Sequence, residues 1–418
     1  MAQTTTVSTV SQLLDAVNDA GIQTIIVSGQ VNDAPTFRLA PGQSLEGADE
    51  AATINFARGT EGVQLSSDNQ LRNLRLRVAP EQRAIFNDTS VESLGQMTLS
   101  AITTTGRVQL LARDRIRSGH VSVNGLDIEA ADARNEHDRP QGYGVYVLQG
   151  AFTLWHMQPD DAVAITADLA GLSAGREGAP VLGSGVFVSG AGDTGGRLVV
   201  SRLETGAVYS DGKIAPGTAD LITGGVFTVY GAHVEQVSNH GPVVTYGQND
   251  MALDNWGVVE QWIADEPITS HGPSGIGFVN FGVVQLLRIN APIETFGRGA
   301  RGFNVYTGTV TLAEFERIVT HADGAVGLQI SQPIGTIIVR HGIETFGGTG
   351  DSLVKGVVMP LSAIALSIKP GGAARRIEIA GGLTTHGSGV SPIEQHGSVE
   401  TLRIEGGCVA AGGGFDQI

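Results

Sequence analysis

The sequence predicts an all-β chain that coils as a single right-handed parallel β-helix of about 25 residues per coil, with a helix capping its N-terminal end. Three observations lead to this prediction. Glycine is abundant, at 59 of 418 residues, and helical periodicity is scarce after Gly21. Above all, an aliphatic residue recurs at steps of 25 residues, at Val243, Ile268, Ile293, Ile318 and Ile343.

Other columns of the repeat keep the same spacing. A hydroxyl residue stands two places after each aliphatic position, and an aromatic residue or histidine follows it, at Tyr246, His271, Phe296, His321 and Phe346. Propeller blades are longer, at about 40 residues, and the leucine-rich frame is missing, so the parallel β-helix remains. Successive coils lie about 4.8 Å apart, so residues 25 apart should stack. Asn255 and Asn280 should then begin an asparagine ladder.

The chain divides into a cap at residues 1–21 and a β-helix at residues 22–418. In the cap, Thr9 and Gln12 resemble a capping box and Gly21 supplies a stop, which predicts a helix over 9–20. Short β-rich runs bounded by turn residues then predict strands at 24–27, 37–39, 108–111, 121–123 and 144–148.

Loop insertions should interrupt the coils in four places. Leu383 lies 40 residues after Ile343, and Leu203 lies 40 before Val243, so each interval holds one coil and 15 extra residues. Polar or glycine-rich composition marks the same kind of excursion earlier in the chain. The expected insertions lie near 129–144, 168–183, 206–222 and 369–382.

Composition disfavours several partners. The formal net charge is −16 without a run of Lys and Arg, so nucleic acid and an anionic membrane surface are poor partners. The single cysteine, Cys408, cannot form an intramolecular disulfide. The first 21 residues lack the basic and apolar regions of a signal peptide, and no apolar run approaches 18 residues, so we expect a cytoplasmic protein.

The segments after the predicted cap helix carry a family resemblance. "IQTIIVSGQV" (22–31) followed by "FRLAPGQSLEGA" (37–48) resembles the first coils of the pectin lyase-like superfamily. The resemblance implies a right-handed parallel β-helix plugged by a helix, and activity on carbohydrates. It identifies no specific family, because the polygalacturonase motifs N-T-D, D-D and G-H-G and the pectate lyase motifs W-I-D-H and R-x-P-x-x-R are missing. The rows at 294–302 and 320–327 also resemble β-helical autotransporter passengers.

Segment 248–266 concentrates the residues that carbohydrate chemistry needs. Glycoside cleavage uses two carboxyl groups about 5 to 9.5 Å apart, and two coils give about 9.6 Å. Carboxylates from this segment and from neighbouring rows are therefore candidate catalytic groups, namely Asp250, Asp254, Glu260, Glu294 and Glu344. The alternative is that these acids are solvated groups on loops and exposed strand faces.

Aromatic and basic residues complete the candidate site. Trp256 shares a column with Phe281 and Tyr306, which forms either a stripe for sugar rings or a stabilising stack. Arg298 shares a column with Asp323, which favours a ladder salt bridge over a substrate contact. The candidate substrate-binding residues are Trp256, Trp262, His271, Phe281, Arg298, Arg301 and Tyr306.

The leading hypothesis is a carbohydrate-active enzyme that cleaves or transfers glycosidic bonds of a mostly neutral glycan by carboxylate acid/base chemistry. One alternative is a non-catalytic structural or adhesin-like protein, assembled as a homo-oligomer with a trimer favoured. Another is a polysaccharide lyase or epimerase that uses Arg298 or Arg301 to neutralise an acidic sugar. We expect no cofactor and no metal, because His271 and His321 alternate with aromatic residues and lie too far apart to share an ion.

Overall fold

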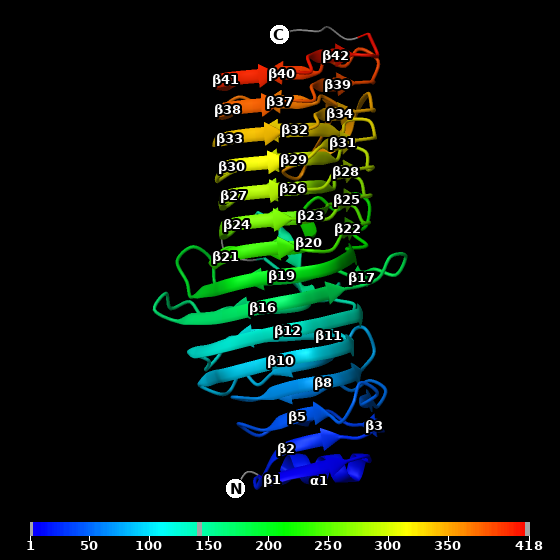
Figure 1. Ribbon diagram of the computed structural model, residues 1–418, viewed down its shortest axis with the longest axis vertical. Helices are drawn as coiled ribbons and strands as arrows, with labels where there is room; N and C mark the ends of the chain where they lie inside the picture. Colours follow the sequence, from blue (N-terminus) through cyan, green and yellow to red (C-terminus); the bar gives the residue numbers. More distant parts are fainter. Residues whose placement is uncertain (1–2, 140–143, 414–418) are drawn as a thin grey trace.

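The computed structural model describes residues 3–139 and 144–413. They form an elongated parallel β-solenoid, in which strands stack from the N-terminal end to the C-terminal end (Figure 1). The described part contains one helix, α1 (Val10–Asn18), which lies across the N-terminal end of the stack. This confirms the all-β class, the stacked parallel strands and the N-terminal position of the helix.

Two long parallel sheets form the walls of the solenoid. Within the described residues, the larger has 25 strands. They are β1 (Gln3–Val7), β2 (Ile22–Val27), β3 (Gln30–Ala34), β5 (Ser44–Gly47), β6 (Thr53–Phe56), β8 (Gln70–Arg77), β10 (Ser93–Thr105), β12 (Ser118–Ala130), β16 (Ala164–Ala174), β17 (Val181–Leu182), β19 (Arg197–Asp211), β21 (Ala232–Asn239), β22 (Val243–Thr245), β24 (Val258–Ala264), β25 (Ile268–Ser270), β27 (Val283–Ile289), β28 (Ile293–Thr295), β30 (Thr309–Phe315), β31 (Ile318–Thr320), β33 (Pro333–Val339), β34 (Ile343–Thr345), β38 (Ala373–Ile379), β39 (Leu383–Thr385), β41 (Ser398–Ile404) and β42 (Cys408–Ala410).

The second sheet, called the site sheet below, has 15 strands in the described residues. They are β4 (Phe37–Arg38), β7 (Val63–Leu65), β9 (Arg83–Asn87), β11 (Arg107–Ala112), β13 (His137–Asp138), β14 (Tyr146–Leu148), β15 (Gly150–His156), β18 (Ser184–Ser189), β20 (Leu221–Thr228), β23 (Asp250–Asn255), β26 (Ile276–Asn280), β29 (Arg301–Val305), β32 (Val326–Ile330), β37 (Leu366–Ile368) and β40 (Ile393–Gln395). A separate antiparallel hairpin consists of β35 (Thr349–Val354) and β36 (Val357–Ser362).

The register confirms the columns of the repeat. Val243 pairs with Ile268, and the pairing continues through Ile293 and Ile318 to Ile343, all of them buried. The asparagine ladder is also present, because Asn255 Nδ2 donates to Asn280 Oδ1 at 2.8 Å. Residues that match in successive rows are therefore vertical neighbours along the stack.

Glycine in the site sheet makes room for the isoleucine column. A Cβ atom on Gly302 would lie 2.2 Å from Ile318 Cγ2 and 2.6 Å from the Gly327 carbonyl oxygen. A Cβ on Gly327 would meet Ile343 Cγ2 at 2.4 Å. The large residue on one wall and the missing side chain on the other are therefore complementary, and they explain part of the high glycine content.

The extra residues near the C-terminal end lie elsewhere than expected. Ile343 pairs with Leu383 as the repeat predicts, but the additional chain between them forms the β35–β36 hairpin. The predicted insertion at 369–382 is wrong, because that segment contains strand β38. The predicted alignment of Leu203 with Val243 is also wrong. Leu203 pairs with Val237, and Val208 is the residue that pairs with Val243.

Two further predicted insertions are partly strand, although residues 212–220 do form a loop. Segment 168–183 overlaps β16 and β17, and segment 206–222 begins inside β19. Strands β12 and β16 each turn the corner of the solenoid at a glycine in the left-handed region, Gly125 (φ 79°) and Gly171 (φ 67°), without leaving the sheet. Glycine at these positions allows a bend within a strand. A glycine-rich segment can therefore have the composition of a loop and still form a strand.

The N-terminal cap is a strand followed by a helix. The Thr9 side chain accepts a hydrogen bond from the Gln12 backbone N–H at 3.3 Å, which confirms Thr9 as the N-cap. The Gln12 carboxamide accepts from the Ser8 N–H at 2.9 Å. Leu13 is fully buried against the first coil. Residues 3–7 form β1, which pairs with β2, so the cap is not helical throughout.

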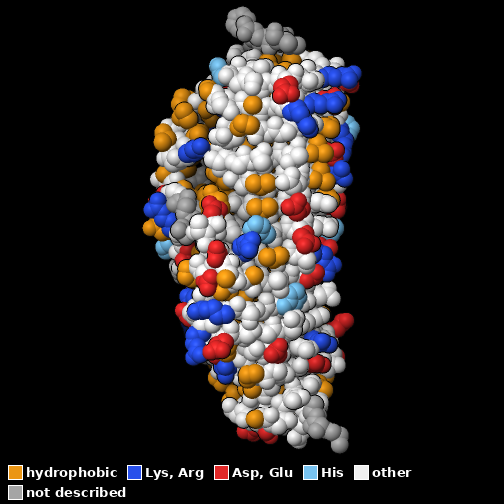
Figure 2. Space-filling view, turned by 90° about the vertical axis from the view of Figure 1, so that its left-hand side faces the viewer, with side chains coloured by type: hydrophobic (Ala, Val, Ile, Leu, Met, Phe, Trp, Pro, Cys, Tyr) orange, Lys and Arg blue, Asp and Glu red, His pale blue; other side chains and the backbone are white. Residues whose placement is uncertain are grey.

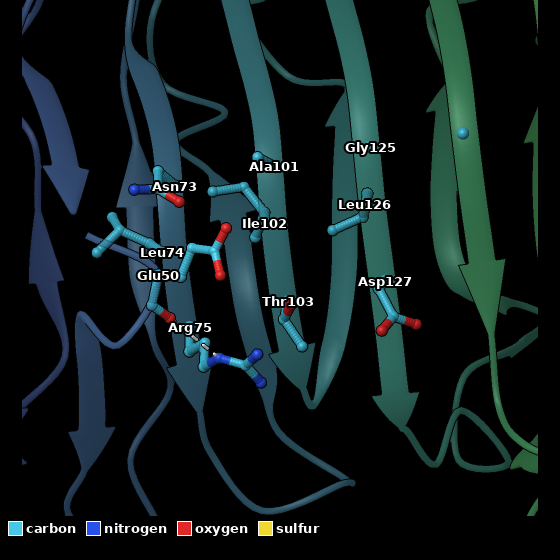
Figure 3. A pocket seen from close by; sticks show the side chains of 11 residues that line it. Glu50, Asn73, Leu74, Arg75, Ala101, Ile102, Thr103, Gly125, Leu126 and Asp127 are labelled. Carbon is cyan, nitrogen blue, oxygen red and sulfur yellow. Dashed lines mark hydrogen bonds between the residues drawn. The ribbon is translucent and has the colours of Figure 1, made fainter. Parts of the chain in front are cut away.

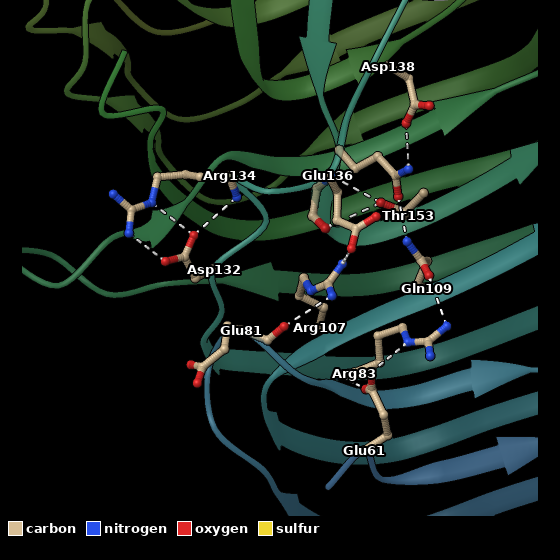
Figure 4. A network of polar contacts seen from close by, with 12 residues as sticks. Glu61, Glu81, Arg83, Arg107, Gln109, Asp132, Arg134, Glu136, Asp138 and Thr153 are labelled. Atoms are coloured by element: carbon tan, nitrogen blue, oxygen red, sulfur yellow. Dashed lines mark hydrogen bonds and ion pairs between the residues drawn. The ribbon is translucent and has the colours of Figure 1, made fainter. Parts of the chain in front are cut away.

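The outer face of the site sheet is covered instead of exposed. Near its N-terminal half, residues 131–139 and 144–149 lie over it and are held by a polar network (Figure 4). In that network Arg107 pairs with Glu136 at 3.1 Å, and Gln149 bridges Gln109 and Asp138 at 2.8 Å each. The expected insertion at 129–144 corresponds in part to this cover, and its residues 140–143 lie outside the described residues.

Candidate functional site

An aromatic turn separates two neighbouring cavities on the solenoid. Each of the strands β23, β26 and β29 is followed by an aromatic residue at the turn into the next coil, namely Trp256, Phe281 and Tyr306. Ring centroids are 4.2 Å apart for Trp256 and Phe281 and 5.2 Å for Phe281 and Tyr306. Tyr230, at the end of the coil before, packs edge-on against Trp256 at 5.6 Å.

The first cavity, the polar groove, lies on the outside of these turns and has a volume of about 470 Å³. Asp193 and Arg197 line it from the loop before β19 and from its first residue, and His233 lines it from β21. Burial, together with the positive charge of Arg197, lowers the pKa of His233. The imidazole is therefore neutral at pH 7 and offers one donor and one acceptor.

The second cavity, the apolar pocket, lies over the outer face of the site sheet and has a volume of about 340 Å³. Its walls combine the aromatic turn with Met251 and Ile276 from the sheet, and with Leu353 and Lys355 from the β35–β36 hairpin. Both cavities share four lining residues, which are Tyr230, Trp256, Phe281 and Thr307. The aromatic turn is therefore a wall common to both.

The two carboxyl groups nearest this wall have contrasting environments. Asp254 is fully buried on the outer face of the site sheet between Phe227 and Val279. Burial raises the pKa of Asp254 well above its usual range, and the Trp256 side chain offsets this only in part. Asp193 is exposed in the polar groove. Burial raises the pKa of the Tyr230 hydroxyl, and both carboxylates raise it further, so Tyr230 lies near both.

Asp250 is fully buried and accepts hydrogen bonds from the backbone of two turns. Its carboxylate accepts from the Gly247 N–H at 2.7 Å, from the Gly212 N–H at 2.9 Å, and from the Thr223 hydroxyl. Burial raises its pKa to about 7, against these hydrogen bonds. The side chain is fully buried and lines neither cavity. Its contacts are those of a structural group that joins a loop to two strands.

The remaining residues of segment 248–266 separate onto different faces. Glu260 is exposed on β24, near His233. Trp262 is fully buried in the core, where its Nε1 donates to Asn239 Oδ1 at 2.8 Å. The structure thus places Trp262 away from both cavities, because the alternation of β24 turns it inward.

The histidine column forms a continuous ring stack on the surface. Centroid separations run from 4.4 to 5.3 Å between successive rings of Tyr246, His271, Phe296, His321, Phe346 and His386. Stacking of this column is confirmed. Two of the candidate catalytic carboxylates pair with histidines of this stack: Glu294 contacts His321 at 2.7 Å, and Glu344 contacts His386 at 2.9 Å as well as Arg317.

The two arginines of the repeat differ sharply. Arg298 is exposed and faces Asp351 on the hairpin at 3.8 Å. The expected bridge between Arg298 and Asp323 is wrong, because the Asp323 carboxylate accepts instead from the Gly348 N–H at 2.7 Å. Arg301 is fully buried on β29, and its Nη1 reaches the Gly299 carbonyl at 3.4 Å.

Several lining residues were not predicted from the sequence. Asp193, Arg197, Tyr230 and His233 come from coils that precede the regular repeat, and Lys355 comes from the hairpin. Asp193, Arg197 and Lys355 share no motif or spacing with Trp256, so only the folded chain brings them together. His233 does keep the 25-residue spacing, because it pairs with Val258 of the same groove. The one sequence signal at this place was the aromatic column itself.

A third cavity lies over the bends of β8, β10 and β12 (Figure 3). It holds about 330 Å³ and is bordered by Glu50, Arg75 and Asp127. Arg75 lies 4.0 Å from Glu129, and Asp127 binds Arg176 at 2.7 Å. These ion pairs already occupy Arg75 and Asp127.

Comparison with protein-family models, with curated proteins and with solved structures found no match. In the described residues, no helix has both the length and the apolar character needed to cross a bilayer. Acidic and basic side chains are interspersed on the face seen in Figure 2, in keeping with the absence of a Lys- and Arg-rich run from the sequence.

Proposed function

We propose that this chain is a carbohydrate-binding protein of the right-handed parallel β-helix type, similar in architecture to the pectin lyase-like superfamily. In this proposal a mostly neutral oligosaccharide lies in the polar groove, against the aromatic turn. The observation that supports it is the aromatic wall shared by two adjacent cavities. Aromatic and apolar lining with a few polar groups is typical of sites for small organic ligands.

The groups around the groove suit sugar hydroxyls. Asp193 accepts hydrogen bonds, Arg197 donates them, and neutral His233 does both. The rings of the aromatic turn stack on one another, so much of each ring face is already covered. A sugar would therefore contact ring edges and the Tyr230 side chain, in place of the stripe of open ring faces expected from the repeat. The net charge of −16 favours a neutral ligand over a polyanion.

Binding can be tested by calorimetric titration with a panel of neutral and acidic oligosaccharides. We expect Trp256→Ala to weaken binding of a neutral oligosaccharide by about tenfold or more, since central aromatic residues dominate binding energy. Trp262→Phe is the matched control, because Trp262 is buried away from both cavities. Failure of the wild-type protein to bind any member of the panel, or equal binding by Trp256→Ala, would overturn the proposal.

Cleavage of the bound glycan is a second candidate function, and the contrast between Asp193 and Asp254 favours it. Paired carboxyl groups in unlike environments can divide the roles of acid and base. In this scheme Asp254 holds the proton and Asp193 acts as base or nucleophile. Because Asp254 is fully buried, its proton would reach the groove through the Tyr230 hydroxyl.

Mass detection of products separates the candidates. Hydrolysis predicts new reducing ends, with turnover lost in both Asp193→Asn and Asp254→Asn while oligosaccharide binding persists. An unsaturated product would indicate a lyase instead. Binding without turnover would leave a non-catalytic, adhesin-like role, for which self-association measured by light scattering is the complementary test.

A further inference from the structure

A buried guanidinium lies beneath the β35–β36 hairpin. Arg301 is fully buried, and among the described residues neither its Nε nor its Nη2 has a hydrogen-bond partner. The hairpin passes directly over it, because the Ser352 hydroxyl donates to the Gly299 carbonyl at 2.7 Å. Burying a cation without a counter-ion costs several kcal/mol, so the fold strongly favours an anion at this place.

The unpartnered donors are the pair that binds a carboxylate side-on. In this same chain Arg134 uses Nε and Nη2 to hold both oxygens of Asp132, at 2.9 and 2.6 Å. Arg301 directs only Nη1 to the protein backbone and leaves the Nε and Nη2 edge open. The donor geometry therefore matches a carboxylate group.

Arg301 lies next to residues that line the apolar pocket, although it is not itself one of them. Arg301 stands in the same column as Ile276 and Met251, which line that pocket. Its Cζ lies 5.9 Å from the centroid of the Tyr306 ring, and Lys355 Nζ lies 5.4 Å from the same centroid. Among the described residues that line the pocket, Lys355 is the one with a charged side chain. Two cations thus lie near the Tyr306 ring: Lys355 lines the pocket, and Arg301 is buried behind the lining.

We propose that the apolar pocket binds a small organic carboxylate, with its carboxyl group on the open edge of Arg301 and its apolar body against Met251, Ile276 and Tyr306. The aliphatic lining disfavours a hydroxyl-rich body and selects an aromatic or aliphatic acid. This site does not depend on oligosaccharide binding, because it uses the hairpin side of the aromatic wall.

Benzoate is a suitable probe of the full-length protein. We expect benzoate to raise Tm and to change the fluorescence of Trp256, which lines the pocket, whereas benzyl alcohol and inorganic phosphate at equal ionic strength do neither. Arg301→Lys keeps the charge but lacks the paired donors, so benzoate should bind about tenfold more weakly or worse. Arg298→Lys, at an exposed position, is the matched control and should bind benzoate like the wild type.

Three results would overturn the proposal: benzoate no more stabilising than benzyl alcohol, phosphate as effective as benzoate, or undiminished binding by Arg301→Lys. If Arg301→Lys does not fold, Lys355→Gln replaces it, because Lys355 is exposed on the hairpin. That variant should weaken benzoate binding several-fold, and unchanged affinity would count against the site. The comparison of benzoate with benzyl alcohol in the wild type needs no variant.

Discussion

The backbone N–H of Leu353 donates a hydrogen bond of 3.0 Å to the side-chain hydroxyl of Ser274, 79 residues earlier in the chain. The β35–β36 hairpin leaves a late coil and folds back over earlier ones. Gly348, just before the hairpin, contacts Asp323, and the hairpin itself then contacts Gly299 and Ser274. The hairpin therefore covers the apolar pocket. It also connects coils that are not neighbours in the stack and that strand pairing does not join.

Removal of this anchor should loosen the hairpin selectively. Ser274→Ala deletes the acceptor and leaves the partly buried Leu353 N–H without its partner, at an expected cost of about 1 kcal/mol. Hydrogen exchange should show faster exchange at Leu353 and its neighbours, with unchanged protection of β26 and β29. Ser28→Ala, at an exposed position, is the control and should leave the hairpin unaffected. Unchanged protection of the hairpin in Ser274→Ala would contradict the role of this contact.

Asp250 should make the protein less stable as pH rises. Its pKa is about 7 in the folded protein and about 3.9 in an unfolded chain, so the folded state holds the extra proton between these values. Unfolding then releases a proton, and stability falls from about pH 4 to about pH 7 by an amount on the order of 4 kcal/mol.

Asp250→Asn should remove that slope and leave the contacts of Gly212 and Gly247 satisfied. The check is denaturant unfolding of both proteins at a series of pH values. The difference in unfolding free energy should change across pH 4–7 in favour of Asp250→Asn and level off above it. A pH-independent difference would show that Asp250 does not titrate in this range.

Gly302→Ala should destabilise the solenoid although alanine is a small residue. The added Cβ would fall 2.2 Å from Ile318 Cγ2 and 2.6 Å from a backbone oxygen, so the coils must move apart. Overpacking of this kind costs about 1 to 3 kcal/mol. Gly59→Ala tests the opposite case, in which the space is open and only the φ of 77° is strained. Thermal denaturation should show the larger loss for Gly302→Ala.

Trp262→Phe should affect stability and not binding. The substitution removes the hydrogen bond to Asn239 Oδ1 and part of a fully buried ring, at a cost of about 2 to 4 kcal/mol. Its affinity for oligosaccharide or benzoate should match that of the wild type. A loss of affinity that exceeds the change in the folded fraction would show that the core position reaches the cavities.

Glu344 should act as a structural ion pair. Hydrogen bonds from His386 and Arg317 outweigh partial burial and hold the pKa of Glu344 below its usual range. The pair therefore stabilises the protein above about pH 4.5, and the contribution disappears as pH falls through the lowered pKa. Glu344→Gln should cost up to about 1 kcal/mol at pH 7. A loss of turnover without loss of stability would restore Glu344 as a catalytic candidate.

The repeat made much of the architecture predictable. Backbone pairing between coils repeats the same geometry at each step, so equal spacing of Ile268, Ile293 and Ile318 in the sequence becomes vertical alignment in the structure. The N-cap at Thr9 was predictable for a similar reason, because capping depends on residues only three apart. Interactions that are local, or that recur at a fixed period, leave a readable pattern.

No pattern in the sequence predicts the position of the hairpin or the residues that line the cavities. Asp193, Tyr230 and Arg301 meet near one wall only because turns, a long strand and a late insertion converge there. Burial also reversed the expected roles of Asp250 and Trp262, since alternation and local bends decide which side chains face inward. The sequence by itself determined the stacking of the coils, through spacing alone. Tertiary structure decided the site, because contacts between segments at irregular distances along the chain depend on how the coils pack.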